Sequence, residues 1–271
     1  MISLIIFKAN VMVKGNLIKQ DQTEFLINTS VKDFNSDTKI YRYIDFDSFL
    51  QILDGKFYVS TKKQFSDCYD AGKEIPIKDI SKNFLMVCGE KQTNLKQYTI
   101  SELREAFKKS QNYLASCWTL SKDNILMWQA YTHGNCGICI ESTIGNVIDS
   151  LDSKSIKPYL ICCSPMYYNG YSNLTEVEEI LFKKLNIYRG EDEIRFYFLS
   201  GKVKNNTKDL DAIAKNNVFE IKPEVLIDNI FLSPFMRGNS AKLLKGNLEE
   251  CYDFLKGHIK ISELSSQYLI L

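Results

Sequence analysis

The sequence predicts an α+β fold, with one domain of mostly antiparallel sheets and helices packed outside them. Three observations support this prediction. Strand-like and helix-like segments follow one another irregularly, without the strand–helix–strand repeat of a parallel sheet. The 271 residues are 45% hydrophobic and 25% charged, which is an ordinary globular composition with enough apolar material for one core. No internal repeat or low-complexity linker divides the chain.

The chain divides into three expected segments. Residues 1–38 are expected to be a variable lead-in with one apolar strand, Ser3–Phe7, followed by polar stretches. Residues 39–236 are expected to form the core of the domain. Residues 237–271 are expected to be a helical C-terminal segment, because "NSAKLLKGNLEECYDFLKGH" has the pattern of one or two helices.

The core opens with a predicted strand, a short helix and a second strand. Ile40–Ile44 has the composition of a strand, and Asp45 or Asp47 can cap the helix that follows. Gly55 is a suitable helix stop, and "KFYVST" after it is expected to be a strand. The apolar side of this helix is expected to consist of Phe49, Leu50, Ile52 and Leu53.

The later elements are predicted by apolar periodicity and by capping residues. The expected strands are Tyr113–Leu120 and the runs "CGICIEST", "IKPYLICCSPMYY", "EIRFYFLS" and "VLIDNIFLSP". The expected helices are Ile100–Asn112, a short helix that starts between Ser121 and Asn124, and a helix that a capping box opens at Thr175–Glu178.

Charge and hydropathy argue against several classes of protein. With 34 basic and 33 acidic residues, the overall charge gives no tendency toward DNA or membrane surfaces. No stretch reaches the ~18 apolar residues of a membrane span, and the N-terminus lacks the features of a signal peptide. No glycine-rich phosphate-binding motif occurs, so Rossmann and P-loop folds have no support. We therefore expect a cytoplasmic protein without a membrane partner.

The eight cysteines include one pair with CxxC spacing, Cys136 and Cys139. In a strand, these two sulfur atoms would point to opposite faces of the sheet. A zinc site would also need His133 and a distant cysteine. Buried free thiols in a reducing cytosol are the better interpretation, and we expect no metal.

The run "IYRGEDEIRF", residues 187–196, concentrates three acids and two arginines before an apolar strand. If the strand begins early, Glu191, Glu193, Arg195 and Tyr197 share one face, because residues two apart point the same way. Two interpretations remain open. The spacing alone favours a solvated sheet face with a Glu–Arg pair, whereas two carboxylates on one face can also perform acid–base chemistry.

A second candidate is "SCWTLSKDNILMWQAYTHGNCGICIE", which holds both tryptophans of the chain. Large aromatic side chains usually pack in cores, but a flat ligand ring would also need such a wall. Trp128 and Tyr131 lie three residues apart on the expected helix and can act together.

The third candidate is Arg42, which alternates with Tyr41 and Tyr43 in a strand and therefore faces the opposite side. An arginine in this position can bind phosphate with two nitrogen atoms, or it can be an ordinary edge residue.

Taken in order, these pieces resemble the bacterial domain-of-unknown-function family 2971. The matching stretches are "YRYIDFDSFLQILDGKFYVSTKKQFSDCYD", the tryptophan-rich run, Tyr188 with the "E-x-E-x-R" of Glu191, Glu193 and Arg195, and "VLIDNIFLSP". They cover about residues 40–235. Two departures affect turns: Ser66 and Cys68 replace the family's asparagine and proline in "FSDCYD", and Ser233 replaces the glycine before Pro234.

A more distant resemblance is to ADP-ribosyltransferases. Their order of a strand arginine, a serine-bearing strand and an E-x-E pair is matched here by Arg42, then Ser60 or Ser116, and then "EDE". The resemblance implies an ADP-ribosyltransferase-like core and NAD as co-substrate. It implies that Glu193 stabilises the oxocarbenium-like ribose and that Glu191 polarises or deprotonates the acceptor.

The same resemblance assigns the residues that bind NAD. Arg42 would hold the phosphates, and a serine would orient Arg42 or Glu193. One of the aromatic side chains would form the wall of the nicotinamide site. The expected NAD-binding residues are Arg42, Tyr41, Ser60, Ser116, Trp118, Trp128 and Tyr131.

The function that the resemblance implies is transfer of ADP-ribose from NAD to a macromolecule, as in a toxin or an antiviral defence effector. The acceptor can be a protein or a nucleic acid, and an antitoxin or inhibitor is a possible partner. The basic runs "KKLNIYR", "KVKNNTK" and "KLLKGN" flank the candidate site, although such runs are usually solvated. Two alternatives remain: a non-catalytic module that binds a nucleotide or a partner, and a metal-dependent nuclease that uses Asp67, Asp70, Glu191 and Glu193.

Overall fold

The structure is a computed structural model that describes residues 15–20, 23–28, 34–65, 113–132, 136–156, 159–168, 182–200 and 217–265. The strands of the main sheet are β1 (Gly15–Gln20), β2 (Thr23–Asn28), β3 (Lys39–Ile44), β5 (Ser60–Thr61), β6 (Leu114–Thr119), β7 (Ile138–Thr143), β8 (Tyr159–Pro165), β9 (Glu193–Ser200), β11 (Asn229–Leu232) and β12 (Ile259–Ile261). Their order is β1-β2-β8-β9-β6-β3-β7-β11-β12, and β5 pairs with β6. Strands β4 (Lys56–Tyr58) and β10 (Val218–Glu220) form a separate pair. Pairing is antiparallel except between β2 and β8 and between β11 and β12, so the predicted α+β class is confirmed.

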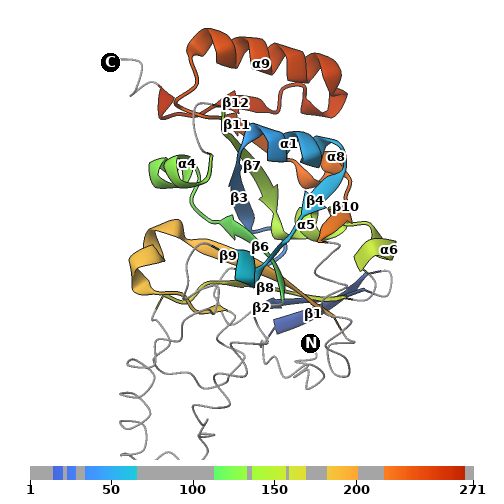
Figure 1. Cartoon of the computed structure of the whole chain (residues 1–271). Helices are drawn as coiled ribbons and strands as arrows, with labels where there is room; N and C mark the ends of the chain where they lie inside the picture. The colour runs from blue at the N-terminus through green and yellow to red at the C-terminus, as the bar shows by residue number, and fades with distance from the viewer. Residues whose placement is uncertain are drawn as a thin grey trace, which may run out of the picture.

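Strand β3 joins two parts of the main sheet. It pairs with β7 along its whole length, whereas its register with β6 consists of Tyr41 opposite Thr119. Figure 1 shows that β8 and β9 run across the direction of β3 and β7. Because β3 and β6 are joined at one residue pair, side chains from both strands can line a common space.

The helices of the described residues pack around these strands. They are α1 (Phe46–Leu53), α4 (Ile125–Tyr131), α5 (Ile144–Ser150), α6 (Ser153–Ile156), α8 (Pro223–Leu226) and α9 (Gly238–Cys251), with 3₁₀ turns η1 (Lys62–Gln64), η3 (Asn186–Glu191) and η5 (Asp253–Leu255). In Figure 1, α1, α5 and α8 lie together on one side of β3 and β7, and α9 lies beside β11 and β12. None of the helices in the described ranges is both long and apolar enough to cross a membrane.

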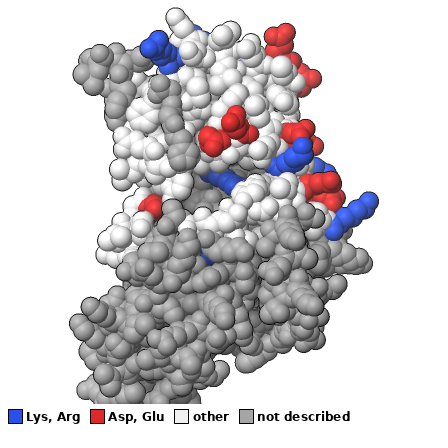
Figure 2. All heavy atoms as spheres, viewed as in Figure 1, with Lys and Arg blue, Asp and Glu red and all other residues white. Residues whose placement is uncertain are grey.

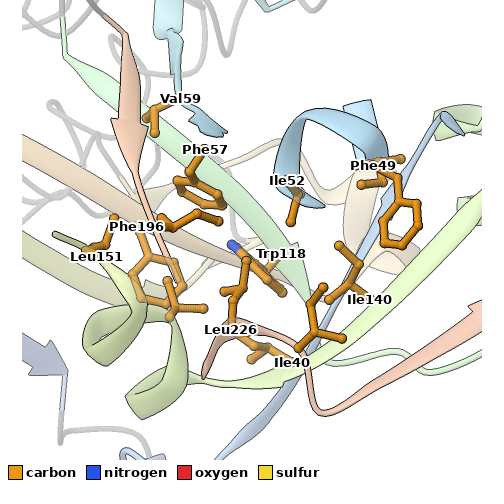
Figure 3. Close-up of a cluster of buried hydrophobic side chains, with 14 of the residues drawn as sticks. Ile40, Phe49, Ile52, Phe57, Val59, Trp118, Ile140, Leu151, Phe196 and Leu226 are labelled. Carbon is orange, nitrogen blue, oxygen red and sulfur yellow. The ribbon is translucent and has the colours of Figure 1, made fainter. Parts of the chain in front are cut away.

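The main core lies between the sheet and the helices α1, α5 and α8. Figure 3 shows Trp118 of β6 within this core, beside Phe57, Phe196 and Leu226. A smaller apolar cluster contains Tyr41, Tyr43, Met127, Trp128, Cys139 and Phe231. Successive side chains of β3 point to opposite faces of the sheet, which explains why there are two clusters. Ile40 and Ile44 belong to the main core, and Tyr41 and Tyr43 belong to the smaller cluster.

Helix α1 follows the sequence prediction in most details. The Asp45 side chain caps it by accepting a hydrogen bond from the Ser48 backbone nitrogen at 2.7 Å. Gly55 follows the helix with a φ of +76°, a conformation that glycine adopts without strain. The prediction was wrong for Leu50, which is 42% exposed, because the eight-residue helix buries a narrower stripe than expected.

Several other expected elements differ from the structure. The run "KFYVST" is divided into β4 and β5, which pair with different partners. The run "VLIDNIFLSP" begins within the short helix α8 and becomes strand β11 only at Asn229. Residues 15–20 and 23–28 were expected to be polar lead-in, but they form β1 and β2, and β2 pairs with β8. These residues join the sheet through main-chain hydrogen bonds, although their amino-acid types did not predict a strand.

Some predictions fall outside the described residues, namely Ser3–Phe7, Ile100–Asn112, Thr175–Glu178, Asp67, Asp70 and His133. Among the described cysteines, Cys139, Cys162 and Cys163 are buried free thiols, as expected. Cys136 and Cys251 are exposed, contrary to that expectation, because Cys136 lies in the turn before β7 and Cys251 is the last residue of α9.

Candidate functional site

A cavity of about 340 Å³ is lined by residues of both β3 and β6, beside the one residue pair that joins the two strands in the sheet. Its lining residues are Tyr41, Arg42, Tyr43, Ile44, Ser60, Phe65, Ala115, Cys117, Trp118, Met127, Tyr131, Lys184, Tyr188, Glu191, Glu193 and Arg195. This volume lies within the range of about 300–1,000 Å³ that is usual for small-molecule sites. Strands β3, β5, β6 and β9, helix α4 and turn η3 all contribute to its walls.

Arg42 places a guanidinium group in the cavity wall. Its Nη1 lies 3.4 Å from Ser116 Oγ, and its Nη2 donates to the Tyr58 carbonyl oxygen at 3.3 Å. The guanidinium carbon is 4.9 Å from the centre of the Phe57 ring and 5.9 Å from that of Trp118. Within the described ranges, no carboxylate forms an ion pair with Arg42. Burial lowers the pKa of Arg42 to about 10, so the side chain stays charged at neutral pH and is suited to bind an anion.

The two candidate acids meet at a buried lysine. Lys184 Nζ donates to Glu191 Oε2 at 2.7 Å and to Glu193 Oε2 at 3.0 Å. On its other oxygen, Glu193 accepts from Arg195 Nε at 2.7 Å and pairs with Arg195 Nη2 at 2.6 Å. Arg195 Nη1 in turn donates to the Tyr197 hydroxyl at 3.1 Å. The two acids and two cations thus form one connected network in the cavity wall, and the Tyr197 phenol joins it from behind the wall.

The local backbone explains how Glu191 and Glu193 reach this network. Glu191 ends η3 and is not part of the strand, so the prediction that it shares a strand face was wrong. Asp192 turns the chain with a φ of +48°, a left-handed conformation that aspartate tolerates better than most residues. Strand β9 begins at Glu193, so the Glu193, Arg195 and Tyr197 part of that prediction is confirmed.

The expectation of a solvated strand face was also wrong. Strand β9 lies between β6 and β8, and Glu193 and Arg195 are only 4% and 1% exposed. Two-residue spacing cannot distinguish an edge strand from a central one, since that depends on strands far away in the sequence. Burial makes the ion pairs essential, because an unpaired charge inside a protein is costly.

Helix α4 supplies one of its two predicted aromatic residues to the cavity. Tyr131 lines the cavity, and burial of its hydroxyl, with the nearby Glu191 carboxylate, raises the pKa of Tyr131. Trp128 does not line it. The Trp128 indole is fully buried, donates to Asp123 Oδ1 at 2.9 Å and lies edge-on to Tyr43 at 4.9 Å. Trp128 is therefore a core residue that anchors the helix, and the expectation that it could contact a ligand has no geometric support.

The remaining predicted binding residues lie in or directly behind the cavity wall. Tyr41, Ser60 and Trp118 line it. Ser116 is 1% exposed and does not line it, but its Oγ accepts a hydrogen bond from Trp118 Nε1 at 3.1 Å and contacts Arg42. The structure thus brings together all the predicted residues except Trp128, and it places Ser116 where a hydroxyl can orient the arginine.

Sequence reasoning missed Lys184 and Tyr188 as parts of the site. The run "KKLNIYR" was expected to be solvated, yet Lys183 and Lys184 are 3% and 6% exposed. Lys184 Nζ also lies 4.8 Å from the centre of the Tyr188 ring. The available signal was the presence of two adjacent lysines close to three acids in one short segment.

Comparison with known proteins adds little to this geometry. No protein-family model matches the chain, so the resemblance to family 2971 gains no support. No curated protein matches it either. One solved structure with a detectable likeness is that of Thermus sp. 2.9 DarT in complex with ADP-ribosylated ssDNA. The two chains are 12% identical, and the match covers 84% of this chain and 95% of DarT with a TM-score of 0.35, which does not establish a common fold.

The distribution of surface charge and the positions of potential metal ligands complete the description of the site. Figure 2 shows acidic and basic side chains interspersed along the edge near α8 and β10, while much of the remaining described surface on this face is uncharged. In the parts of the chain that the structure describes, no group of three or more potential metal ligands occurs. The Glu191 carboxylate contacts Lys184, and the Glu193 carboxylate contacts both Lys184 and Arg195.

Proposed function

We propose that the protein is an NAD-dependent ADP-ribosyltransferase that acts on a macromolecule. The observation that carries this proposal is the placement of Arg42, Glu191 and Glu193 in the wall of one cavity. The three residues come from distant parts of the sequence, and their order is that of the ADP-ribosyltransferase resemblance. A cavity that brings two acids together with a guanidinium that forms no ion pair in the described ranges can hold a dinucleotide and act on its ribose.

Arg42 would bind the pyrophosphate of NAD. Phosphate oxygens match the fork of a guanidinium group, and Arg42 has only two long hydrogen bonds to protein acceptors in the described ranges. Ser116 would orient this fork through its contact with Nη1. The aromatic side chains of Trp118, Tyr131 and Tyr188 would provide flat apolar surface for the nicotinamide ring.

Glu193 would stabilise the positive charge that develops on the ribose when nicotinamide leaves. Its carboxylate is fixed by Arg195, so the negative charge is positioned before the reaction begins. Glu191 is 20% exposed at its side chain, compared with 4% for Glu193. Its greater exposure suits a base that receives the acceptor nucleophile from outside the cavity.

A non-catalytic nucleotide-binding module on the same fold is the second candidate. It is favoured by the two cations on Glu193, because they partly neutralise the charge that the reaction would need. Calorimetry distinguishes the two candidates when it is combined with product analysis. Binding of NAD without release of nicotinamide would favour the module.

The test of the transferase uses purified protein, NAD labelled in the adenosine part and a cell lysate as source of acceptors. The wild type should release nicotinamide and label a macromolecule, and Glu193→Gln should reduce both by at least roughly 100-fold. Glu220→Gln, at an exposed position of β10, is the matched control and should keep full activity. The proposal fails if the wild type does neither reaction, or if Glu193→Gln is as active as the control. Digestion of the labelled product with protease or nuclease identifies the acceptor class.

A further inference from the structure

We infer that Lys184 is a positioning residue that holds Glu191 and Glu193 together and offsets the repulsion between their carboxylates. The two carboxylate oxygens contact one nitrogen atom, at 2.7 Å and 3.0 Å, so their separation cannot exceed the sum of these distances. Carboxylates this close repel each other, and without a cation between them one takes up a proton more readily. No other lysine of the described residues contacts both acids.

The position of Lys184 is fixed by its backbone. The backbone nitrogen of Lys184 donates to the Tyr167 carbonyl oxygen at 3.0 Å, and the backbone nitrogen of Tyr167 donates to the Phe182 carbonyl oxygen at 2.7 Å. These bonds hold the segment beside the end of β8, in an isolated bridge between Tyr167 and Lys183. The ammonium group therefore reaches the acids from a segment whose main chain is anchored on Tyr167, just after β8.

The burial of Lys184 supports a specific role. Its side chain is only 8% exposed, and lysine is rarely buried unless it is paired. The Tyr188 ring covers the ammonium group at 4.8 Å to the ring centre. This contact limits the positions that the lysine can take and also excludes water from it.

Other titratable groups surround the lysine and the two acids. Arg195 on β9 carries the second positive charge of the network. Tyr131 on α4 and Tyr168 after β8 are also nearby. Burial raises the pKa of each phenol, and the positive charge of Lys184 partly opposes this increase. The Tyr168 hydroxyl also accepts a hydrogen bond from the Glu193 nitrogen at 2.6 Å. These phenols remain protonated at neutral pH and carry no charge. The positive charges next to the two carboxylates are therefore those of Lys184 and Arg195.

Arg195 and Lys184 have different roles in this arrangement. Among the described residues, Arg195 contacts Glu193 and forms no hydrogen bond or ion pair with Glu191, whereas Lys184 contacts both acids. Loss of Lys184 should therefore separate the pair, while the orientation of Glu193 is retained. The effect on activity rests on the proposed function, but the effect on protonation does not.

The experiment follows the side-chain carboxyl signals of full-length protein labelled with carbon-13 at glutamate Cδ. Spectra of Glu191→Gln and Glu193→Gln assign the two signals. In Lys184→Met one of the two signals should move farther toward the protonated position between about pH 8 and pH 6 than the same signal does in the wild type. Lys184→Arg should restore the wild-type titration, and Lys222→Met, at an exposed lysine, is the control.

Lys184→Gln keeps a hydrogen-bond donor without the charge, and it replaces Lys184→Met if that variant does not fold. It should show the same change in titration. If the wild type releases nicotinamide, the acid limb of its pH–rate profile should move upward by about one pH unit or more in the uncharged variants, with a KM for NAD within roughly threefold. Unchanged carboxyl titration in both uncharged variants overturns the inference. A changed titration in a protein that never releases nicotinamide supports the charge role of Lys184 and rejects the proposed function alone.

Discussion

Two nitrogen atoms of Arg195 contact the same carboxylate oxygen of Glu193, Nε at 2.7 Å and Nη2 at 2.6 Å. The two residues are neighbours on one face of β9, and both are almost completely buried. The arrangement fixes the direction of the Glu193 carboxylate through a rigid planar group. A carboxylate held in this way needs little reorganisation when charge develops nearby.

The first prediction concerns this pair. Arg195→Lys keeps the charge but loses the planar fork, so the free energy of unfolding should decrease by about 1–3 kcal/mol. Arg195→Met should cost more, about 3–5 kcal/mol, because it removes one partner of a buried ion pair. Urea denaturation measures both values. Arg189→Lys, at an exposed position of η3, is the control and should have no comparable effect. Equal stability of all three variants and the wild type would show that the fork contributes little.

The second prediction concerns Arg42 as the anion site. Arg42→Lys should weaken NAD binding by roughly tenfold and Arg42→Ala by roughly 100-fold, since a charge-assisted hydrogen bond contributes about 1.5–3 kcal/mol. Titration calorimetry with NAD, and with nicotinamide riboside as a ligand without phosphate, measures the effect.

The loss should be confined to the phosphate-containing ligand. Arg237→Ala, at the exposed N-cap of α9, is the matched control and should bind NAD like the wild type. If Arg42→Ala binds both ligands as the wild type does, Arg42 is not the phosphate site.

The third prediction concerns Asp123, which joins the start of α4 to the segment after β12. Its carboxylate accepts hydrogen bonds from Trp128 Nε1 at 2.9 Å, from the Ser262 hydroxyl and from the Glu263 nitrogen at 2.7 Å. Asp123 has a φ of +55°, which asparagine also tolerates, so Asp123→Asn changes the charge without adding backbone strain. Its free energy of unfolding should decrease by about 2 kcal/mol.

Chemical denaturation of Asp123→Asn and of Asp253→Asn provides the comparison. Asp253 is exposed and pairs with Lys256 three residues away, so its substitution should have little effect. A decrease of the same size in both variants would mean that the carboxylate of Asp123 has no special role.

The fourth prediction is a dependence of stability on alkaline pH through Tyr41. Burial, with the nearby Glu141 carboxylate, raises the pKa of Tyr41 from about 10 to about 12. The folded state therefore holds the phenol proton more strongly than the unfolded state does. The resulting stability is fully present below about pH 10 and is lost as the pH rises from about 10 to about 12.

Comparison of the wild type with Tyr41→Phe isolates this effect from that of other tyrosines. The difference in unfolding free energy between the two proteins should be constant between pH 7 and 9 and should shift in favour of Tyr41→Phe by pH 11, by roughly 1 kcal/mol. Parallel stability curves up to pH 11 would contradict the assignment.

Local features of the fold were predictable because they depend on neighbours in the sequence. Examples are the Asp45 cap, the stop at Gly55 and the start of α4 after Asn124. The burial of Glu193 was not predictable, because it depends on β6 and β8, which are distant in the sequence. The same reason applies to Lys184, whose position is set by a bridge to Tyr167. The order of Arg42 and the two acids suggested a common site, but only tertiary structure could place them in one cavity.

The most direct test of the account is a crystal structure with a carbocyclic analogue of NAD that cannot lose nicotinamide. We expect a phosphate oxygen within hydrogen-bond distance of the Arg42 guanidinium and a hydroxyl of the nicotinamide-side ring within hydrogen-bond distance of Glu193. The nicotinamide should lie against Trp118, Tyr131 or Tyr188. An analogue bound outside this cavity, or within it but away from both Arg42 and Glu193, would contradict the claim that these residues serve one dinucleotide.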